Sequence, residues 1–303
     1  MKKIACFIVV CLFFLCRHGY AYWVWSPQTN KWVNPVYRTF DTPEEQFNWA
    51  KKYFDDGDYR KAISEFKKVL KKFKESAFAP EAKYYLGLCY EKLGKLYPAF
   101  ETYQSVIDIY PLNDRLEEIV ERQYIIGEKF FTKRKYDLAK DIFAKVLENA
   151  PYSKVSDVAQ YKVALCYLKM RDYVNARDEL SSLMENYGYS PYLDDASFHI
   201  GFCSFKISSS VKDYDEELVD KAIDDLEYFL RRFQTSDYVP KAQSLLDKLK
   251  HRKAERLFVV AQFYEKQRKT YAAIKYYEEV VFSYEKTDWA KQARARLKRL
   301  REK

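Results

Sequence analysis

Cysteine and histidine are the residue types whose spacing in this sequence comes nearest to a chemical site. Beyond residue 21 the chain holds three cysteines, Cys89, Cys166 and Cys203, and two histidines, His199 and His251. His199 and Cys203 are one helical turn apart and could supply two metal ligands, but no second pair accompanies them. We therefore expect a packed helix face here, with no metal and no cofactor.

The three cysteines occupy equivalent places in a repeated pattern, two residues after a small residue each time. Equivalent helices of neighbouring repeats lie roughly 10 Å apart, whereas a disulfide needs Cα atoms within about 7 Å. The sequence therefore predicts buried, unpaired thiols that behave as small apolar side chains.

Other catalytic patterns are missing from the sequence. It contains no glycine-rich phosphate loop and no nucleophile elbow. Its carboxylates fall on predicted polar helix faces, where a solvated surface is the ordinary outcome. We predict that the protein is not an enzyme, and a secreted enzyme or enzyme accessory is the least favoured alternative. No small-molecule substrate is expected.

The elements that carry these residues are predicted to be helical almost throughout. Only 7 glycines and 9 prolines occur in 303 residues, while 28 Tyr and 21 Phe supply material for a large core. The net charge is +9, and seven Lys or Arg against two acids lie between Asp288 and Lys303. Because the remaining charges nearly balance, nucleic acid is not an expected partner.

The first 21 residues have the pattern of an export signal. Lys2 and Lys3 precede an apolar run from Ile4 to Leu15 that is too short to span a bilayer. Because Leu15 rather than a small residue precedes Cys16, cleavage after Ala21 is favoured over lipidation at Cys16. The alternative is an uncleaved amphipathic anchor. The chain is therefore expected to be exported.

A repeat of about 37 residues organises the rest of the chain. A small residue is followed three positions later by an aromatic residue, then by an alanine at position 12 and, in most units, an aromatic at position 16. Two helices per unit explain this pattern, since the small residues allow close approach and the aromatics fill space between units. The anchors are Ala50, Gly87, Gly127, Ala164 and Gly201, spaced by 37, 40, 37 and 37, with Ala261 beginning a sixth unit.

The residues of the second unit resemble the tetratricopeptide repeat, and the longer period resembles the BamD family of outer-membrane protein assembly lipoproteins. The resemblance extends from about Thr42 to Leu300. It implies an all-α superhelical solenoid of about six helix pairs, preceded by a short aromatic hairpin. The matching residues are Leu86, Gly87, Tyr90, Gly94, Ala99, Tyr103 and Pro111.

The same resemblance implies a location in the periplasm, peripheral to the outer membrane. It also implies a non-enzymatic scaffold in the assembly and insertion of outer-membrane β-barrel proteins. Its partners would be a β-barrel insertase complex and extended peptides of unfolded outer-membrane proteins. The alternative is another periplasmic adaptor, for cell-wall, division or polysaccharide-export complexes. The predicted domains are a signal peptide (1–21), a tryptophan-rich leader (22–40), a repeat domain (41–285) and a basic capping helix (286–303).

The fifth unit departs from the pattern. Gly201 and its partner Ala222 are 21 residues apart instead of 12, and the insert between them is polar and turn-forming. A protruding loop is expected there. The extra length around 239–253 predicts an additional or extended helix.

Three groups of residues are candidates for binding. In the first, every residue three before an anchor is aromatic, and apolar residues follow the fourth and fifth anchors. If the first helices line a concave surface, as the resemblance implies, these residues form a peptide groove; the alternative is packing between units. They are Phe47, Tyr84, Tyr124, Tyr161, Leu165, Leu168, Phe198, Phe202, Phe205 and Phe258.

The other two groups lie at the ends of the chain. Trp23, Trp25 and Trp32 form two short aromatic runs around a turn, which predicts a hairpin that contacts a partner, a membrane interface or its own first repeat. Arg294, Lys298 and Arg301 share one side of the last predicted helix. They either favour the helix dipole or contact an acidic partner or anionic membrane.

Overall fold

The computed structural model describes residues 24–26, 31–33, 39–210 and 214–302. The predicted signal peptide, Trp23 and the tip of the expected loop at 211–213 lie outside the described residues. The chain divides into two compact units, unit 1 up to Asn113 and unit 2 from Asp114 onward. Within the described residues, unit 1 holds one hairpin and four helices, and unit 2 holds nine helices.

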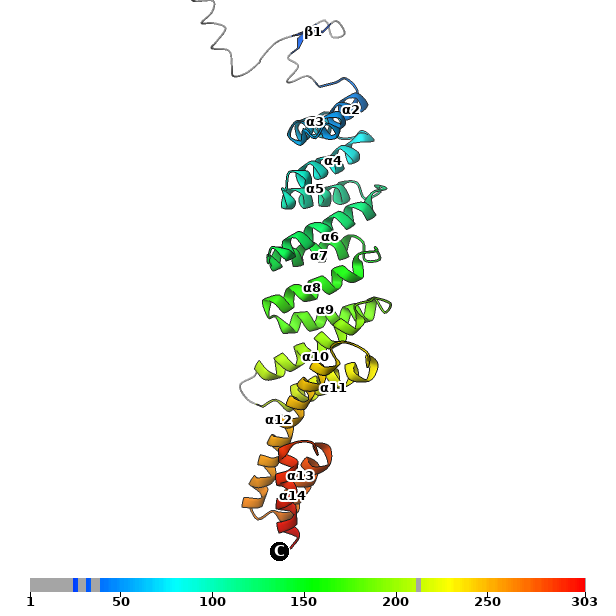
Figure 1. Ribbon diagram of the computed structural model, residues 1–303. Helices are drawn as coiled ribbons and strands as arrows, with labels where there is room; N and C mark the ends of the chain where they lie inside the picture. Colours follow the sequence, from blue (N-terminus) through cyan, green and yellow to red (C-terminus); the bar gives the residue numbers. More distant parts are fainter. Residues whose placement is uncertain (1–23, 27–30, 34–38, 211–213, 303) are drawn as a thin grey trace, which may run out of the picture. The chain divides into compact units, whose positions relative to one another are not determined.

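The elements follow the predicted pairing (Figure 1). The described helices confirm an all-α helical-repeat fold, with six pairs from α2–α3 to α12–α13 and α14 after the last pair. Unit 1 contains β1 (Val24–Ser26), β2 (Lys31–Val33), α2 (Pro43–Asp55), α3 (Tyr59–Lys72), α4 (Phe78–Lys92) and α5 (Leu96–Ile109). Unit 2 contains α6 (Leu116–Thr132), α7 (Tyr136–Asn149), α8 (Ser156–Met170), α9 (Tyr173–Asn186), α10 (Leu193–Ser210), α11 (Glu216–Arg232), α12 (Val239–Lys266), α13 (Thr270–Ser283) and α14 (Asp288–Arg301).

The aromatic leader forms the predicted hairpin. β1 and β2 pair antiparallel with Trp25 opposite Trp32, and the two rings meet edge to face with centroids 5.8 Å apart. Cross-strand aromatic pairs of this kind stabilise short hairpins. Both tryptophans remain exposed, at 43% and 62%.

Small residues bring the paired helices together, as the sequence predicts. A Cβ atom added to Gly87 would lie 2.5 Å from the ring of Tyr103, and one added to Gly127 would lie 2.6 Å from the ring of Phe143. Both rings are fully buried, so only glycine fits at these two anchors. Gly201 is confined in the same way by Leu226, whose Cδ2 would lie 2.6 Å from an added Cβ.

The turns inside the pairs use left-handed backbone. Gly57 and Gly94 have φ of 79° and 71°, and the equivalent turn residues Arg134, Arg171 and Arg268 have φ of 59°, 63° and 58°. The second helix is capped by an aspartate in three pairs: the side chain of Asp58, Asp172 or Asp215 accepts a hydrogen bond from a backbone N–H of the first turn.

The cysteines are free and buried, which confirms the sequence prediction. Burial raises the pKa of Cys89, Cys166 and Cys203 to about 12, because the thiolate would lose its hydration. They therefore remain protonated at neutral pH and serve as core side chains.

The extra length after the fifth unit is an extended helix. α12 runs for 28 residues without a break. Ala242, Leu246 and Leu249 in its first half pack in one core with Phe198 and Leu226. Its second half belongs to another core, with α13 and α14.

Candidate partner-binding surface at the C-terminal helices

The aromatic residues that precede the anchors lie mostly between helices. Five of the six are at most 7% exposed, and Tyr124 is half-buried. Four of them contact a ring at the head of the next first helix, with centroids 4.3–5.5 Å apart. These pairs are Phe47–Phe78, Tyr161–Tyr192, Phe198–Tyr238 and Phe258–Trp289.

Tyrosine hydroxyls complete this packing around one carboxylate in unit 2. Tyr238 donates a hydrogen bond to Asp195 at 2.9 Å, and Tyr161 donates to the same oxygen at 3.4 Å. His199 lies against these rings, and its Nδ1 is 2.7 Å from the backbone oxygen of Asp195. Burial lowers the pKa of His199, so the neutral imidazole is favoured in this cluster.

The remaining groove candidates are partly accessible. Leu165 and Leu168 lie at the edge of the core of the fourth pair. Phe202 and Phe205 lie at the edge of the next core. A peptide could reach the solvent-facing parts of these four side chains, whereas the buried rings present little surface. A binding role for either set stays a prediction.

The basic segment at the end of the chain forms α14, which packs on α13 and α12. Its apolar stripe is buried: Ala290 and Ala293 are fully covered, and Leu297 is 7% exposed. The N-cap is Thr287, whose hydroxyl accepts the N–H of Ala290. This packing fixes the direction of the polar residues on the other side of the helix.

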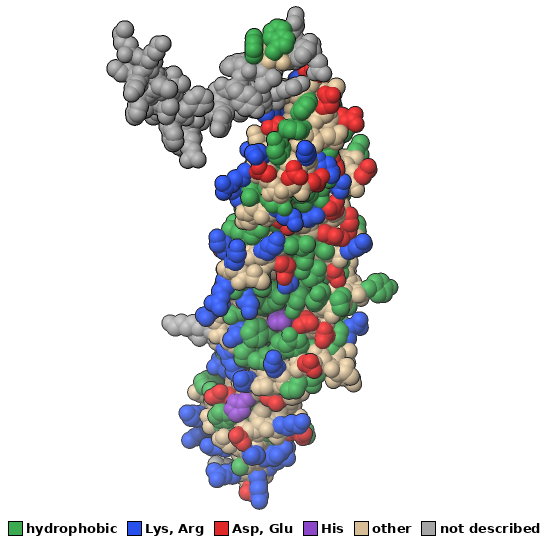
Figure 2. All heavy atoms as spheres, turned by 45° about the horizontal axis from the view of Figure 1, so that its top comes forward, with side chains coloured by type: hydrophobic (Ala, Val, Ile, Leu, Met, Phe, Trp, Pro, Cys, Tyr) green, Lys and Arg blue, Asp and Glu red, His purple; other side chains and the backbone are tan. Residues whose placement is uncertain are grey.

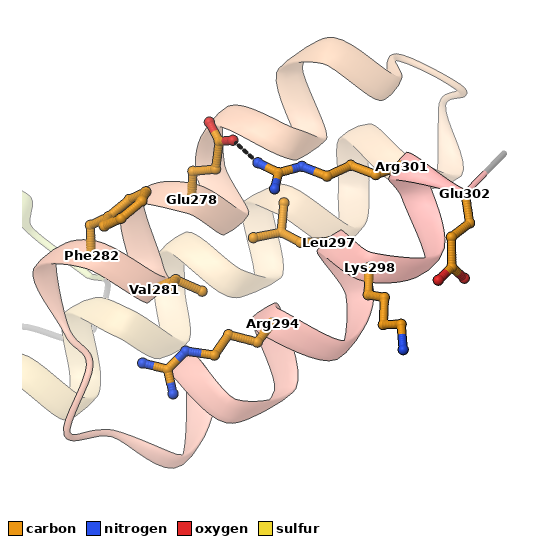
Figure 3. A pocket seen from close by; sticks show the side chains of 8 residues that line it. All are labelled: Glu278, Val281, Phe282, Arg294, Leu297, Lys298, Arg301 and Glu302. Atoms are coloured by element: carbon orange, nitrogen blue, oxygen red, sulfur yellow. Dashed lines mark hydrogen bonds and ion pairs between the residues drawn. The ribbon is translucent and has the colours of Figure 1, made fainter.

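A pocket of about 450 Å³ lies between α13 and α14, and all three predicted basic residues line it. Figure 3 shows Arg294, Lys298 and Arg301 projecting from α14, with Leu297 directed toward α13. Val281, Phe282 and Leu297 supply the apolar lining of the pocket, and Glu278 and Glu302 are the two acidic residues that line it.

The charges of the pocket are only partly compensated. Arg301 forms an ion pair with Glu278 at 2.5 Å. Within the described residues, the other ion pairs of α14 join Lys291 to Asp288 and Arg296 to Glu265. Arg294 and Lys298 therefore have no ion pair there and can receive an anionic group.

Phe282 connects this pocket to a second one. The second pocket, of about 490 Å³, lies between α12 and the α13–α14 loop, and Phe282 lines both. The ring is 79% exposed. His251 lines the second pocket and accepts a hydrogen bond from Trp289 Nε1 at 3.1 Å. An exposed ring between two pockets is a typical anchor position for a protein partner.

Sequence reasoning did not find Phe282 or Glu278. Phe282 follows two apolar residues on a helix, and spacing alone does not separate it from core residues. The ring partners of the pre-anchor aromatics were also missed, although a signal exists. Three of them lie 31 residues after the aromatic they contact, and the fourth lies 40 residues after it because of the insert.

No further site is apparent where side chains are described. In that part of the chain, no three His, Cys, Asp or Glu residues are placed to hold a metal ion. None of the described helices is both long enough and apolar enough to cross a bilayer.

Paired helices with close-packed small anchors define a tetratricopeptide-repeat protein, and residues 47–114 match that family. The class is one of non-catalytic protein-interaction scaffolds. Residues 117–303, more than half of the chain, match the outer membrane lipoprotein family YfiO, and the chain belongs to that family. The family is also called the BamD family, so the sequence resemblance is confirmed. It indicates a cell-envelope location.

Several solved structures are similar to the chain at low identity. A tetratricopeptide-repeat protein from Parabacteroides merdae is 14% identical over 86% of this chain and 99% of its own, with a TM-score of 0.36. MamA from Desulfovibrio magneticus is 16% identical over 66% and 99%, with a TM-score of 0.35. The peptide-binding repeat protein YrrB is 18% identical over 59% and 84%, with a TM-score of 0.33. No curated protein matched the sequence.

Proposed function

We propose that the protein is a non-enzymatic periplasmic scaffold that takes part in assembling and inserting outer-membrane β-barrel proteins. The observation that carries the proposal is the family match over residues 117–303, because those residues make up nearly all of unit 2 and include the pocket at α13 and α14. The protein would bind a β-barrel insertase and extended client peptides, and would lie at the periplasmic face of the outer membrane.

The chemistry of the pocket fits a folded partner domain better than a small ligand. Phe282 is exposed and offers an apolar anchor, while Arg294 and Lys298 offer unpaired positive charge beside it. Such a combination suits a surface with one hydrophobic residue flanked by acidic side chains. Client peptides would bind to the solvent-facing parts of Leu165 and Leu168 on α8 and of Phe202 and Phe205 on α10.

Isolation of the protein with its partners from envelope membranes tests this proposal. We expect the β-barrel insertase to be isolated with the wild-type chain, and the triple variant Arg294→Glu, Lys298→Glu, Arg301→Glu to lose it. The matched control reverses Lys291 and Arg299, exposed basic residues of the same helix that do not line the pocket. Circular dichroism must show that both variants remain helical.

The outcomes separate the two candidate functions. Recovery of division, cell-wall or polysaccharide-export proteins in place of the insertase would favour the alternative adaptor. If the insertase stays bound to the triple variant but is lost from the control variant, its binding surface on the protein lies outside the pocket.

A further inference from the structure

One edge of unit 2 carries a row of basic turns. They are the loops 133–135, 171–172 and 267–269, which join α6 to α7, α8 to α9 and α12 to α13. We call these three loops the basic edge. They contain six Lys or Arg and one Asp, whereas the loops between successive pairs in unit 2, at 150–155, 187–192, 233–238 and 284–287, contain two of each sign. The six are Lys133, Arg134, Lys135, Arg171, Arg268 and Lys269.

These six side chains are exposed to solvent. In Figure 1 the three turns lie on the left side of unit 2, and Figure 2 shows Lys and Arg side chains gathered along the same side. The ion pairs that the described residues form do not include any of the six. Lys135 and Lys269 extend over the rings of Phe130 and Tyr264, at 5.9 Å from each centroid. The positive charge of this edge is therefore available to an external anion.

The backbone of the turn does not require arginine. Arg134, Arg171 and Arg268 have positive φ, a conformation that glycine adopts more readily than any residue with a Cβ atom. Unit 1 places glycine at the same turn positions, Gly57 and Gly94. Three arginines in unit 2 occupy positions where glycine is the better residue for folding.

Helix dipoles do not explain the arginines either. A cation near the C-terminus of the first helix is favourable, but the same argument applies to unit 1. There the α2–α3 turn consists of Asp56, Gly57 and Asp58, which carries two negative charges at the same place. The other unit 1 turn, 93–95, carries one basic residue, and the α10–α11 loop of unit 2, 211–215, carries one Lys and two Asp. The excess of positive charge therefore belongs to the three turns of the basic edge and not to the turn type.

We propose that the basic edge lies against an anionic phospholipid surface. Head-group phosphates are dense, mobile anions that bind exposed Lys and Arg without a shaped pocket. The edge has that chemistry: long charged side chains on three separate turns. The family to which the chain belongs is one of outer membrane lipoproteins, so a bilayer is the nearest large anionic surface. The inference does not depend on which protein occupies the α13–α14 pocket.

Glycine substitution gives a test in which loss of folding is not expected. The triple variant Arg134→Gly, Arg171→Gly, Arg268→Gly removes three charges and relieves three strained turns, so it should unfold at a higher urea concentration than the wild type. A second variant with lysine at the three positions keeps the charge. The matched control, Lys154→Gln, Lys241→Gln, Lys286→Gln, removes three exposed charges from or beside the loops between pairs.

The measurement is co-sedimentation of the purified full chain with vesicles. We expect binding to vesicles of phosphatidylethanolamine with 30% phosphatidylglycerol, and weak binding to vesicles without the anionic lipid. Each basic residue near such a surface contributes roughly a fivefold factor, so the glycine variant should bind about a hundredfold more weakly. The lysine variant and the loop control should bind as the wild type does. All binding should weaken as salt rises above 0.15 M, where the screening length is about 8 Å.

Three outcomes would overturn the proposal. The first is equal binding by the wild type and the glycine variant, and the second is an equal loss in the loop control. The third is a glycine variant that still binds vesicles but loses a protein isolated with the wild type, since the edge would then bind an acidic protein. Insertase recovery should be the same for the wild type and the glycine variant, which separates this test from that of the proposed function.

Discussion

Gly127 is the position where close packing of two paired helices can be tested most directly. A Cβ atom added there would lie 2.6 Å from Cε1 and 2.9 Å from Cδ1 of Phe143. The ring is fully buried and also packs against Tyr124, with centroids 5.5 Å apart. Because the added Cβ would overlap the ring, Gly127→Ala must shift either the ring or the helix that carries it.

Two opposing terms set the expected change in the free energy of unfolding. Alanine in place of glycine inside a helix stabilises by about 1 kcal/mol, whereas overpacking a closed core costs about 1–3 kcal/mol. Gly127→Ala should therefore destabilise by about 0–2 kcal/mol. Gly188 is the control, because a Cβ there meets nothing within 4 Å and its φ is not positive. Gly188→Ala should stabilise by about 0.4–1 kcal/mol.

Urea unfolding monitored by circular dichroism gives the free energy of unfolding of each variant, and comparison with the wild type gives both changes. Phe143→Leu, made alone and together with Gly127→Ala, completes a double-mutant cycle. If the clash is the cause, the double variant should be more stable than the sum of the single changes by at least about 1 kcal/mol. A Gly127→Ala variant as stable as Gly188→Ala, together with additive behaviour in the cycle, would refute the reasoning.

Further predictions concern the cysteines, the aromatic pairs and the N-terminus. The three buried thiols have a pKa raised to about 12 by burial, so alkylation at pH 8 should modify them only after unfolding, which mass spectrometry detects. Phe198→Ala should destabilise by about 3–5 kcal/mol because the ring is stacked on Tyr238, and unchanged peptide affinity in the folded fraction would exclude a groove role. The intact mass of the protein from a native-like host should correspond to an unlipidated chain starting at Tyr22, and a diacylglyceryl group on Cys16 would contradict it.

The sequence predicted the repeat well because its geometry rests on short-range rules. A small residue at the anchor, with a ring sixteen positions later, specifies two helices in close contact, and Gly127 with Phe143 shows that contact. The extended helix after the fifth unit was predicted from length alone, and α12 confirms it. These features need no knowledge of neighbouring units.

The candidate site was less accessible to sequence reasoning because it depends on which helix face is covered. Tyr161 and Tyr192 lie 31 residues apart, and the meaning of that spacing became clear only when the structure showed the two rings stacked on each other. Phe282 and Val280 are both apolar and both on α13, yet one is 79% exposed and the other is fully buried. The basic residues of α14 could be predicted because their charge excludes them from a core, whichever way the helix packs.

The unbroken α12 has a consequence for how the end of the chain unfolds. In repeat proteins each unit usually contacts only its neighbours, so terminal units can open separately. Here Leu249 belongs to the core of the fifth pair and Leu257 to the core of the sixth, on one continuous helix. Opening the sixth pair alone would expose the apolar face of the second half of α12 or break the helix near its middle. Because both outcomes cost free energy, the fifth and sixth pairs are expected to open together. Amide hydrogens from Ala242 to Ala261 should therefore exchange as one cooperative group, and the pocket beside α13 would be lost or kept together with the fifth pair.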